Sequence, residues 1–348
     1  MLPSEQNRQT IDGRSSDMKY ERVALIFPGQ GSQYVGMGKE FYDRFKLVRD
    51  IYDEAGSVLG YDIAEKCFKK PIPGAAIIHK PDLDRTIYTQ PAVMVTGYVC
   101  YRIFEEMCKE VGVHPNVRFL AGHSLGEYTA LLVAGAMDFR TCADLVNKRA
   151  TCITEFSEAY PHAALMAIVN KGGDLDQGRI ETLTKEAQVH IALNNTKNQL
   201  VVGGFKKNLE ELSKTLKKEG LFSTVLKVEG PFHTPLMKPA ADRFKNDLAA
   251  NRIYIAHKPV IANVSAEAIV DPLHIRKELY EQIYTCVDWR RGAERMAENG
   301  VDLFIEIGPK KVLSGMIKSI APKIPTLNVE DVESLEATIR ELGAQQEG

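Results

Sequence analysis

Short apolar runs that end in glycine-rich stretches mark the strands of a predicted central sheet. Residues 23–27 are such a run, residues 117–121 predict a second strand that is apolar except for Arg118, and each leads directly into a loop with several glycines. Runs of this length, bounded by turn residues, are typical of strands that are buried on both faces. Amphipathic segments at residues 38–59 and 90–111 lie between them and predict helices. This alternation of strands and helices predicts an α/β fold.

The pattern changes between residues 161 and 228, where six shorter elements follow one another. They are expected at residues 163–169 (strand), 176–187 (helix), 189–193 and 199–202 (strands), 209–218 (helix) and 222–228 (strand). This βαββαβ order describes a small ferredoxin-like unit. Strands at residues 258–264 and 303–307 and a helix at residues 312–320 then resume the larger domain, and a terminal helix is expected from residue 330.

The predicted organisation is one α/β domain interrupted by a smaller one. The main domain takes residues 20–160 and 229–330, the ferredoxin-like subdomain takes residues 161–228, and a C-terminal helix and tail take residues 331–348. Residues 1–19 are polar and predict a disordered N-terminal tail, with the remnant of an organelle-targeting segment as the alternative.

Composition excludes several classes of function. The 348 residues are 44% hydrophobic and 26% charged, as in an ordinary globular protein, and the net charge of -2 predicts neither nucleic acid nor an anionic membrane as a partner. The six cysteines form no C-x-x-C pair, which favours reduced thiols over disulfides or a metal site. No apolar run has the length of about 18 residues that a membrane span requires. We therefore expect a cytoplasmic protein, and a monomer.

The strongest chemical motif is the G-x-S-x-G pattern of residues 122–126, which centres on Ser124. Such a pattern alone is often a plain turn, but here a predicted strand precedes it and a helix-compatible segment, residues 127–134, follows it. That context is typical of a nucleophile elbow, in which a strained turn between strand and helix exposes the serine. We therefore interpret Ser124 as a nucleophile.

A serine hydroxyl needs a base to remove its proton, and His233 is the best candidate among the eight histidines. It lies between Pro231 and Pro235, in a loop that holds a side chain rigidly at the surface. The alternative is a solvated loop histidine. His123 is adjacent to Ser124 but points elsewhere if the turn is sharp, so we expect a structural role for it.

Five motifs together resemble one known family. They are residues 27–33 (FPGQGSQ), 122–128 (GHSLGEY), 232–237 (FHTPLM), 263–265 (NVS) and 306–309 (EIGP). In this order they are similar to the malonyl-CoA:acyl carrier protein transacylases and the related acyltransferase domains of polyketide synthases, and the resemblance covers residues 20–327. It implies an α/β-hydrolase-like main domain with a ferredoxin-like insert, and a Ser-His pair without an acid. The implied activity is transfer of malonyl from coenzyme A to an acyl carrier protein.

The resemblance also implies roles for single residues. The main-chain oxygen of Gln282 would orient His233, although a surface helix glutamine is the alternative, and Cys286 stands where the family commonly has proline. Arg149 would bind the free carboxylate of malonyl, against the alternative of a solvated helix face. Phe232 would crowd an α-methyl group and so favour malonyl over methylmalonyl.

Acyl transfer needs two N–H donors for the oxyanion, and we expect them at Leu125 and Gln30. The alternative for the loop of residues 28–33 is phosphate binding, but the order G-x-x-x-x-G-K-[ST] is absent. The expected mechanism is ping-pong, with malonyl-CoA and acyl carrier protein as substrates and no metal or bound cofactor.

Two rival functions remain from the sequence. An acyl hydrolase acting on carrier proteins would have no use for a buried Arg149, and a non-catalytic docking module would not need Ser124 with His233. The choice between fatty acid and polyketide synthesis stays open, as do the carrier protein, its docking surface and other extender units. Lysines on the predicted helix of residues 209–218 and just before it suit an acidic carrier or a solvated face.

Overall fold

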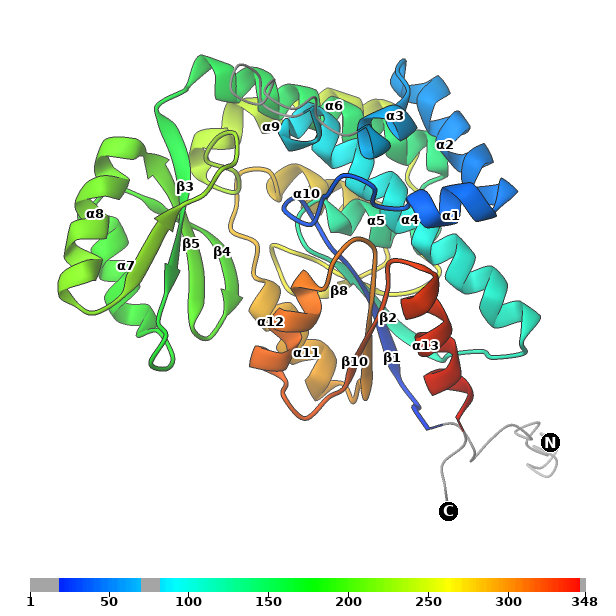
Figure 1. Cartoon of the computed structure of the whole chain (residues 1–348). Coiled ribbons are helices and arrows are strands. Elements are labelled where there is room, and N and C mark those ends of the chain that lie inside the picture. Colours follow the sequence, from blue (N-terminus) through cyan, green and yellow to red (C-terminus); the bar gives the residue numbers. More distant parts are fainter. Residues whose placement is uncertain (1–18, 70–81, 345–348) are drawn as a thin grey trace, which may run out of the picture.

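The protein is a mixed α/β structure with two separate sheets, shown by a computed structural model that describes residues 19–69 and 82–344 (Figure 1). The tail expected at residues 1–19 lies outside the described residues except for Lys19, as does the end of the chain from residue 345. No helix in the described ranges is long and apolar enough to cross a membrane.

The larger sheet has six described strands in the order β10-β9-β1-β2-β7-β8. All neighbours in it are parallel except β7 and β8. The strands are β1 (Val23–Phe27), β2 (Val117–Gly122), β7 (Val260–Ile261), β8 (Ala268–Ile269), β9 (Leu303–Ile307) and β10 (Thr326–Val329). Every residue of β1 and β9 is buried, which is why β1 reads as an unbroken apolar run in the sequence and β9 as a run interrupted only by Glu306.

Helices cover both faces of this sheet. They are α1 (Lys39–Arg44), α2 (Lys46–Leu59), α3 (Ile63–Phe68), α4 (Thr86–Glu110), α5 (Gly126–Val133), α6 (Phe139–Ala159), α9 (Lys238–Ala250), α10 (Pro272–Glu281), α11 (Trp289–Glu298), α12 (Val312–Ile320) and α13 (Val332–Gly343), with short 3-10 turns at η2 (Asp82–Asp84) and η3 (Pro235–Met237). Alternate residues of β1 belong to different cores: Val23, Leu25 and Phe27 to the larger, Ala24 and Ile26 to the one beneath α11 and α12.

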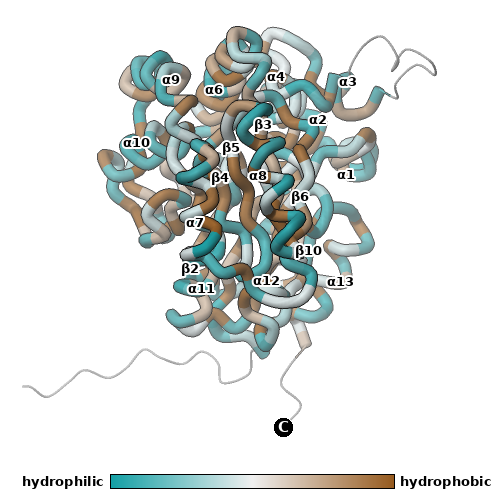
Figure 2. Tube along the Cα trace, turned by 90° about the vertical axis from the view of Figure 1, so that its left-hand side faces the viewer, coloured by the Kyte–Doolittle hydropathy of each residue, from teal (hydrophilic) through white to brown (hydrophobic). Residues whose placement is uncertain are grey.

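The smaller sheet is antiparallel, with the order β4-β5-β3-β6. Its elements are β3 (Ala163–Val169), α7 (Gln177–Glu186), β4 (His190–Thr196), β5 (Gln199–Phe205), α8 (Lys206–Lys218) and β6 (Phe222–Val225). They follow one another in the predicted order of strands and helices. A third apolar core lies between this sheet and its two helices, and Figure 2, which is viewed from this side, shows the hydrophobic residues along β5.

Several predicted boundaries were wrong. The helix expected at residues 38–59 is two helices, because Phe45 takes an extended conformation between α1 and α2. The helix expected from residue 90 begins one turn earlier, at Thr86. The strand expected at residues 258–264 pairs over only two residues, because Asn263 leaves the sheet to bond the turn after β2.

Glycine is required where α5 begins against the end of β1. A Cβ added to Gly126 would lie 2.0 Å from the main-chain oxygen of Phe27 and 2.9 Å from that of Pro28. Backbone atoms cannot move aside as a flexible side chain can. The start of α5 can therefore approach β1 this closely only without a side chain.

We predict that Gly126→Ala destabilises the fold by about 1–3 kcal/mol or more, because the added methyl group overpacks against fixed backbone. Gly315→Ala is the matched control: it lies inside α12, and an added Cβ would meet nothing within 4 Å. That change should stabilise the helix by roughly 0.5–1 kcal/mol. Urea unfolding of both variants measures the difference, and equal stabilities would contradict the packing described.

Candidate active site

Ser124 occupies a strained turn between β2 and α5. Its φ of 51° is left-handed, which is uncommon for a residue with a side chain. The Ser124 amide donates to Asn263 Oδ1 at 2.6 Å, and Asn263 Nδ2 donates to the Gly122 oxygen at 2.7 Å. Asn263 thus braces both sides of the turn from the end of β7. The sequence contained Asn263 in a motif but did not indicate this task.

The structure brings Ser124, His233 and Gln282 together from three distant parts of the chain. Ser124 Oγ lies 2.7 Å from His233 Nε2, and His233 Nδ1 lies 2.5 Å from the main-chain oxygen of Gln282. A carbonyl oxygen only accepts, so Nδ1 carries the proton and Nε2 is free to accept from the serine. The bond forms with Cys286 in the loop, so this departure from the family pattern leaves the contact intact.

His233 is buried, with only 4% of its surface exposed. Burial lowers the pKa of His233 to about 3, and the positive charge of Arg149 adds to the decrease. Both causes act in the same direction because each disfavours the charged imidazolium. The ring is therefore neutral at pH 7 and available as a base.

Arg149 is buried beneath Ser124 and faces neutral acceptors. Its Nη1 donates to Gln90 Oε1 at 2.6 Å, and its Nη2 donates to Gln282 Oε1 at 2.9 Å and to Ser124 Oγ at 3.3 Å. Nε makes no hydrogen bond to any described residue. A buried guanidinium among neutral groups is suited to receive an anion. Sequence reasoning did not single out Gln90, which carries no signal of its own in α4.

The amides of Leu125 and Gln30 lie on two backbone segments that approach each other closely. A Cβ added to Gly29 would lie 2.2 Å from the His123 oxygen and 3.6 Å from the Leu125 nitrogen. Neither amide donates to another group in the described part of the chain. The loop after β1 therefore packs against the elbow after β2, and each segment carries an amide without an acceptor among the described residues.

The fifth motif, residues 306–309, packs against the loop that follows β1. Glu306 at the end of β9 accepts from the amides of Leu313 and Ser314, which holds the start of α12. Gly308, with a φ of 135°, packs where an added Cβ would lie 2.9 Å from the ring of Pro28. These residues shape the site without touching Ser124.

Two further predicted residues have simple surroundings. His123 points away from the serine: its Nε2 lies 2.9 Å from Asn195 Oδ1, and its ring meets the edge of Trp289. That arrangement agrees with the structural role expected for it. Phe232 is buried next to His233 in the same loop.

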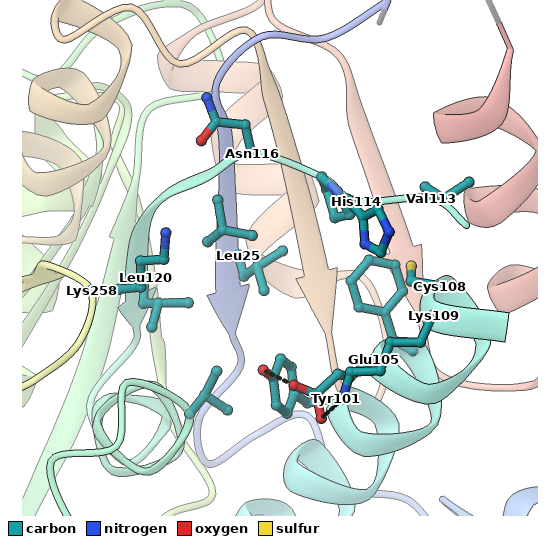
Figure 3. A pocket seen from close by; sticks show the side chains of 14 residues that line it. Leu25, Tyr101, Glu105, Cys108, Lys109, Val113, His114, Asn116, Leu120 and Lys258 are labelled. Carbon is teal, nitrogen blue, oxygen red and sulfur yellow. Dashed lines mark hydrogen bonds and ion pairs between the residues drawn. The ribbon is translucent and has the colours of Figure 1, made fainter. Parts of the chain in front are cut away.

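Of two pockets in the described structure, one is lined by a predicted site residue and the other is not. One of about 570 Å³ is bordered by His233, Pro235 and Cys286 together with residues of α7 and β4, so the base borders a pocket shared with the smaller sheet and its helix. Another, of about 270 Å³, lies beside the first residues of β2 and the end of α4 (Figure 3). Leu25, Tyr101 and Leu120 line it, and no predicted site residue does.

Comparison with known proteins agrees with this geometry. The protein-family model described as the acyl transferase domain matches residues 24–347. The malonyl CoA-acyl carrier protein transacylase of Bacillus subtilis strain 168 is 37% identical, covering 92% of this chain and 97% of its own. The chain belongs to the malonyl-CoA:acyl carrier protein transacylase family.

Solved structures of this family have the same fold. The transacylase of Coxiella burnetii superposes with a TM-score of 0.85 at 32% identity, covering 93% of this chain and 99% of its own. A malonyl-transacylase solved in complex with a type II PKS acyl-carrier protein superposes with a TM-score of 0.82 at 31% identity, covering 92% and 99%. The resemblance inferred from five motifs is thus confirmed over nearly the whole chain.

We predict that Ser124 reacts at a rate that stays level from pH 8 to pH 5. With an ordinary histidine pKa of 6.5, the neutral fraction of His233 would fall about thirtyfold by pH 5, whereas its lowered pKa keeps the base neutral. The measurement is the rate of labelling by phenylmethylsulfonyl fluoride, with Ser124→Ala as the unlabelled control. A rate that halves near pH 6.5 would show that His233 titrates normally.

Proposed function

We propose that this protein transfers malonyl from coenzyme A to the phosphopantetheine thiol of an acyl carrier protein, through an ester on Ser124. One observation carries the proposal: Ser124 Oγ lies 2.7 Å from a neutral histidine and 3.3 Å from a buried arginine. A nucleophile, its base and a cation for a free carboxylate therefore meet at a single atom. The names of the relatives support the same reaction.

The first half-reaction acylates the enzyme. His233 Nε2 takes the Ser124 proton as Oγ attacks the thioester carbonyl, and the amides of Leu125 and Gln30 donate to the resulting oxyanion. The tetrahedral intermediate collapses, the C–S bond breaks, and the sulfur of coenzyme A leaves with the proton from His233. The Gln282 main-chain oxygen stabilises the transient imidazolium through Nδ1–H.

The second half-reaction reverses these roles with a different thiol. The carrier's phosphopantetheine thiol gives its proton to His233 and attacks the malonyl ester, and Ser124 recovers its proton as the C–O bond breaks. Arg149 holds the malonyl carboxylate throughout both half-reactions, because its protein partners are neutral groups and leave its charge uncompensated. The proposed catalytic residues are Ser124, His233 and Gln282.

The remaining features of the proposal follow from the same site. Phe232, adjacent to the base, restricts the space at the α-carbon of the acyl group and favours malonyl over methylmalonyl. The reaction needs no metal or bound cofactor, since serine chemistry supplies every step. We propose a cytoplasmic monomer, without nucleic acid or membrane partners, that serves fatty acid or polyketide synthesis.

The architecture is proposed to divide as the sequence predicted. The parallel sheet and its helices, residues 20–160 and 229–330, form an α/β-hydrolase-like domain, and residues 161–228 form a ferredoxin-like subdomain, followed by a C-terminal helix and tail at residues 331–348. The connection order and the antiparallel order β4-β5-β3-β6 support the second assignment.

The rival functions fit the site less well. An acyl hydrolase for simple acyl chains has no use for a buried cation that contacts the nucleophile, as Arg149 does. A docking module would not need the aligned serine and histidine. Transfer of malonyl uses both features.

We predict that Ser124→Ala abolishes the covalent malonyl adduct that mass spectrometry detects after mixing the protein with malonyl-CoA. His233→Ala should slow both adduct formation and discharge to the carrier thiol, because one base serves both half-reactions. Circular dichroism checks that both variants fold. An adduct that persists in Ser124→Ala would exclude Ser124 as the nucleophile.

We predict that Arg149→Ala changes substrate preference. The malonyl carboxylate would enter a desolvated pocket without its partner, a loss on the order of 2–5 kcal/mol. Transfer of malonyl should fall by roughly a hundredfold or more, while transfer of acetyl, which carries no such charge, should hold or rise. Arg149→Lys is the control that keeps the charge without the planar pair of donors. Equal losses for both thioesters in kcat/KM would mean that Arg149 only supports the fold.

A further inference from the structure

The side chain of Gln282 links three parts of the site, in addition to the main-chain oxygen that holds His233. Its Nε2 donates to the main-chain oxygen of Ser124 at 2.8 Å and to Glu127 Oε2 at 2.5 Å. Its Oε1 accepts from Arg149 Nη2 at 2.9 Å. One amide group therefore contacts both the elbow and the arginine.

The two ends of an amide are not interchangeable in this position. Arginine only donates, so Oε1 of Gln282 must face Arg149. Nε2, at the other end of the amide, faces two acceptors, the main-chain oxygen of Ser124 and the carboxyl group of Glu127. If the amide were flipped, its N–H groups would face the donors of Arg149 and its oxygen would face the oxygen of Glu127. Glu127 and Arg149 thus select the same orientation of the Gln282 side chain.

Glu127 is itself rigidly held. It lies in the first turn of α5 and has no exposed surface. Its Oε1 accepts from the Asn263 amide at 3.3 Å, and the neighbouring Glu278 accepts from the Val264 amide at 2.7 Å. Burial, reinforced by Glu278, raises the pKa of Glu127 well above its usual value. Its oxygen accepts from Gln282 whether or not the carboxyl group is protonated.

A buried carboxyl group in this place is costly for stability and is not part of the proposed chemistry. Glu127 makes no hydrogen bond to Ser124 Oγ, His233 or Arg149 in the described part of the chain. Its strongest contact is with the Gln282 amide. A longer bond of 3.3 Å also links Glu127 to Asn263, which braces the Ser124 turn. The shorter bond leads through Gln282 to Arg149.

We propose that Glu127 is a positioning residue: through the side-chain amide of Gln282, it sets the orientation of Arg149 and so the preference for acyl groups that carry a carboxylate. This inference rests on the proposed malonyl transfer. Glu127 touches no reacting atom. The base is held by the main chain of Gln282 and the oxyanion by the amides of Leu125 and Gln30, so neither depends directly on Glu127.

The test compares malonyl-CoA with acetyl-CoA in Glu127→Met, which keeps the side-chain volume and removes the acceptor. The ratio of kcat/KM for malonyl to that for acetyl should fall about tenfold, through a higher KM for malonyl, with acetyl transfer within about twofold of wild type. Glu127→Gln still presents an oxygen to Gln282 and gives up only the 3.3 Å bond from Asn263, so it should restore most of the preference.

Glu278→Gln is the matched control, because Glu278 is a neighbouring buried acid whose side chain has no hydrogen bond to the Gln282 side chain among the described residues; the bond from the Gln282 amide to the Glu278 main-chain oxygen is kept in this variant. It should leave the malonyl-to-acetyl ratio unchanged. Gln282→Met keeps the main-chain oxygen, and a double variant with Glu127→Met should have the same ratio as Gln282→Met alone. Additive effects would mean that Glu127 acts by another route and would overturn the inference.

Other results of these measurements also test the positioning role of Glu127. A folded Glu127→Met that loses malonyl and acetyl transfer equally, or neither, overturns the positioning role. If Glu127→Met does not fold, Glu127→Asp decides by the same ratio, because it withdraws the carboxyl group from Gln282 by one methylene. A wild-type protein that transfers no malonyl would instead refute the proposed function, and this result is separate from any variant.

Discussion

The main-chain oxygen of Phe27 joins the two loops that form the site. It accepts from the His123 amide at 3.0 Å, and α5 begins so close to it that Gly126 has no room for a side chain. Because β1 and β2 are parallel, with Phe27 opposite Gly122, both strands end at the same level. The loop after each strand therefore reaches the same point, as is general for ligand sites at the carboxyl ends of parallel strands.

A buried polar network then holds the chemistry in place. Polar groups removed from water are costly unless each finds a partner, and Gln282 contributes a partner to Arg149, Glu127, Ser124 and His233 at once. Such a network is already oriented before substrate arrives, which lowers the reorganisation needed in the transition state. The buried Nε of Arg149 has no hydrogen-bond partner among the described residues.

The small sheet also supports the site. Its strand β4 pairs with Val287, through bonds between the Asn194 amide and the Val287 oxygen and between the Val287 amide and the Ala192 oxygen. Val287 follows shortly after Gln282, so the carbonyl that orients His233 belongs to a loop that is fixed to the small sheet. Asn195 of the same strand contacts the ring of His123, which points away from the nucleophile.

The sequence by itself determined what depends on neighbours along the chain. Buried strands appear as apolar runs, and the elbow at Ser124 needs only the order strand, turn and helix. The five motifs also identified the family. The loop between two prolines already indicated His233 as the base, whereas only family resemblance indicated Arg149 and Gln282. The tertiary structure alone decided how the side chain of Glu127 meets that of Gln282, because these residues are 155 positions apart. A hydrogen bond across that separation leaves no periodic pattern in the sequence, since its geometry depends on how the sheets and helices pack.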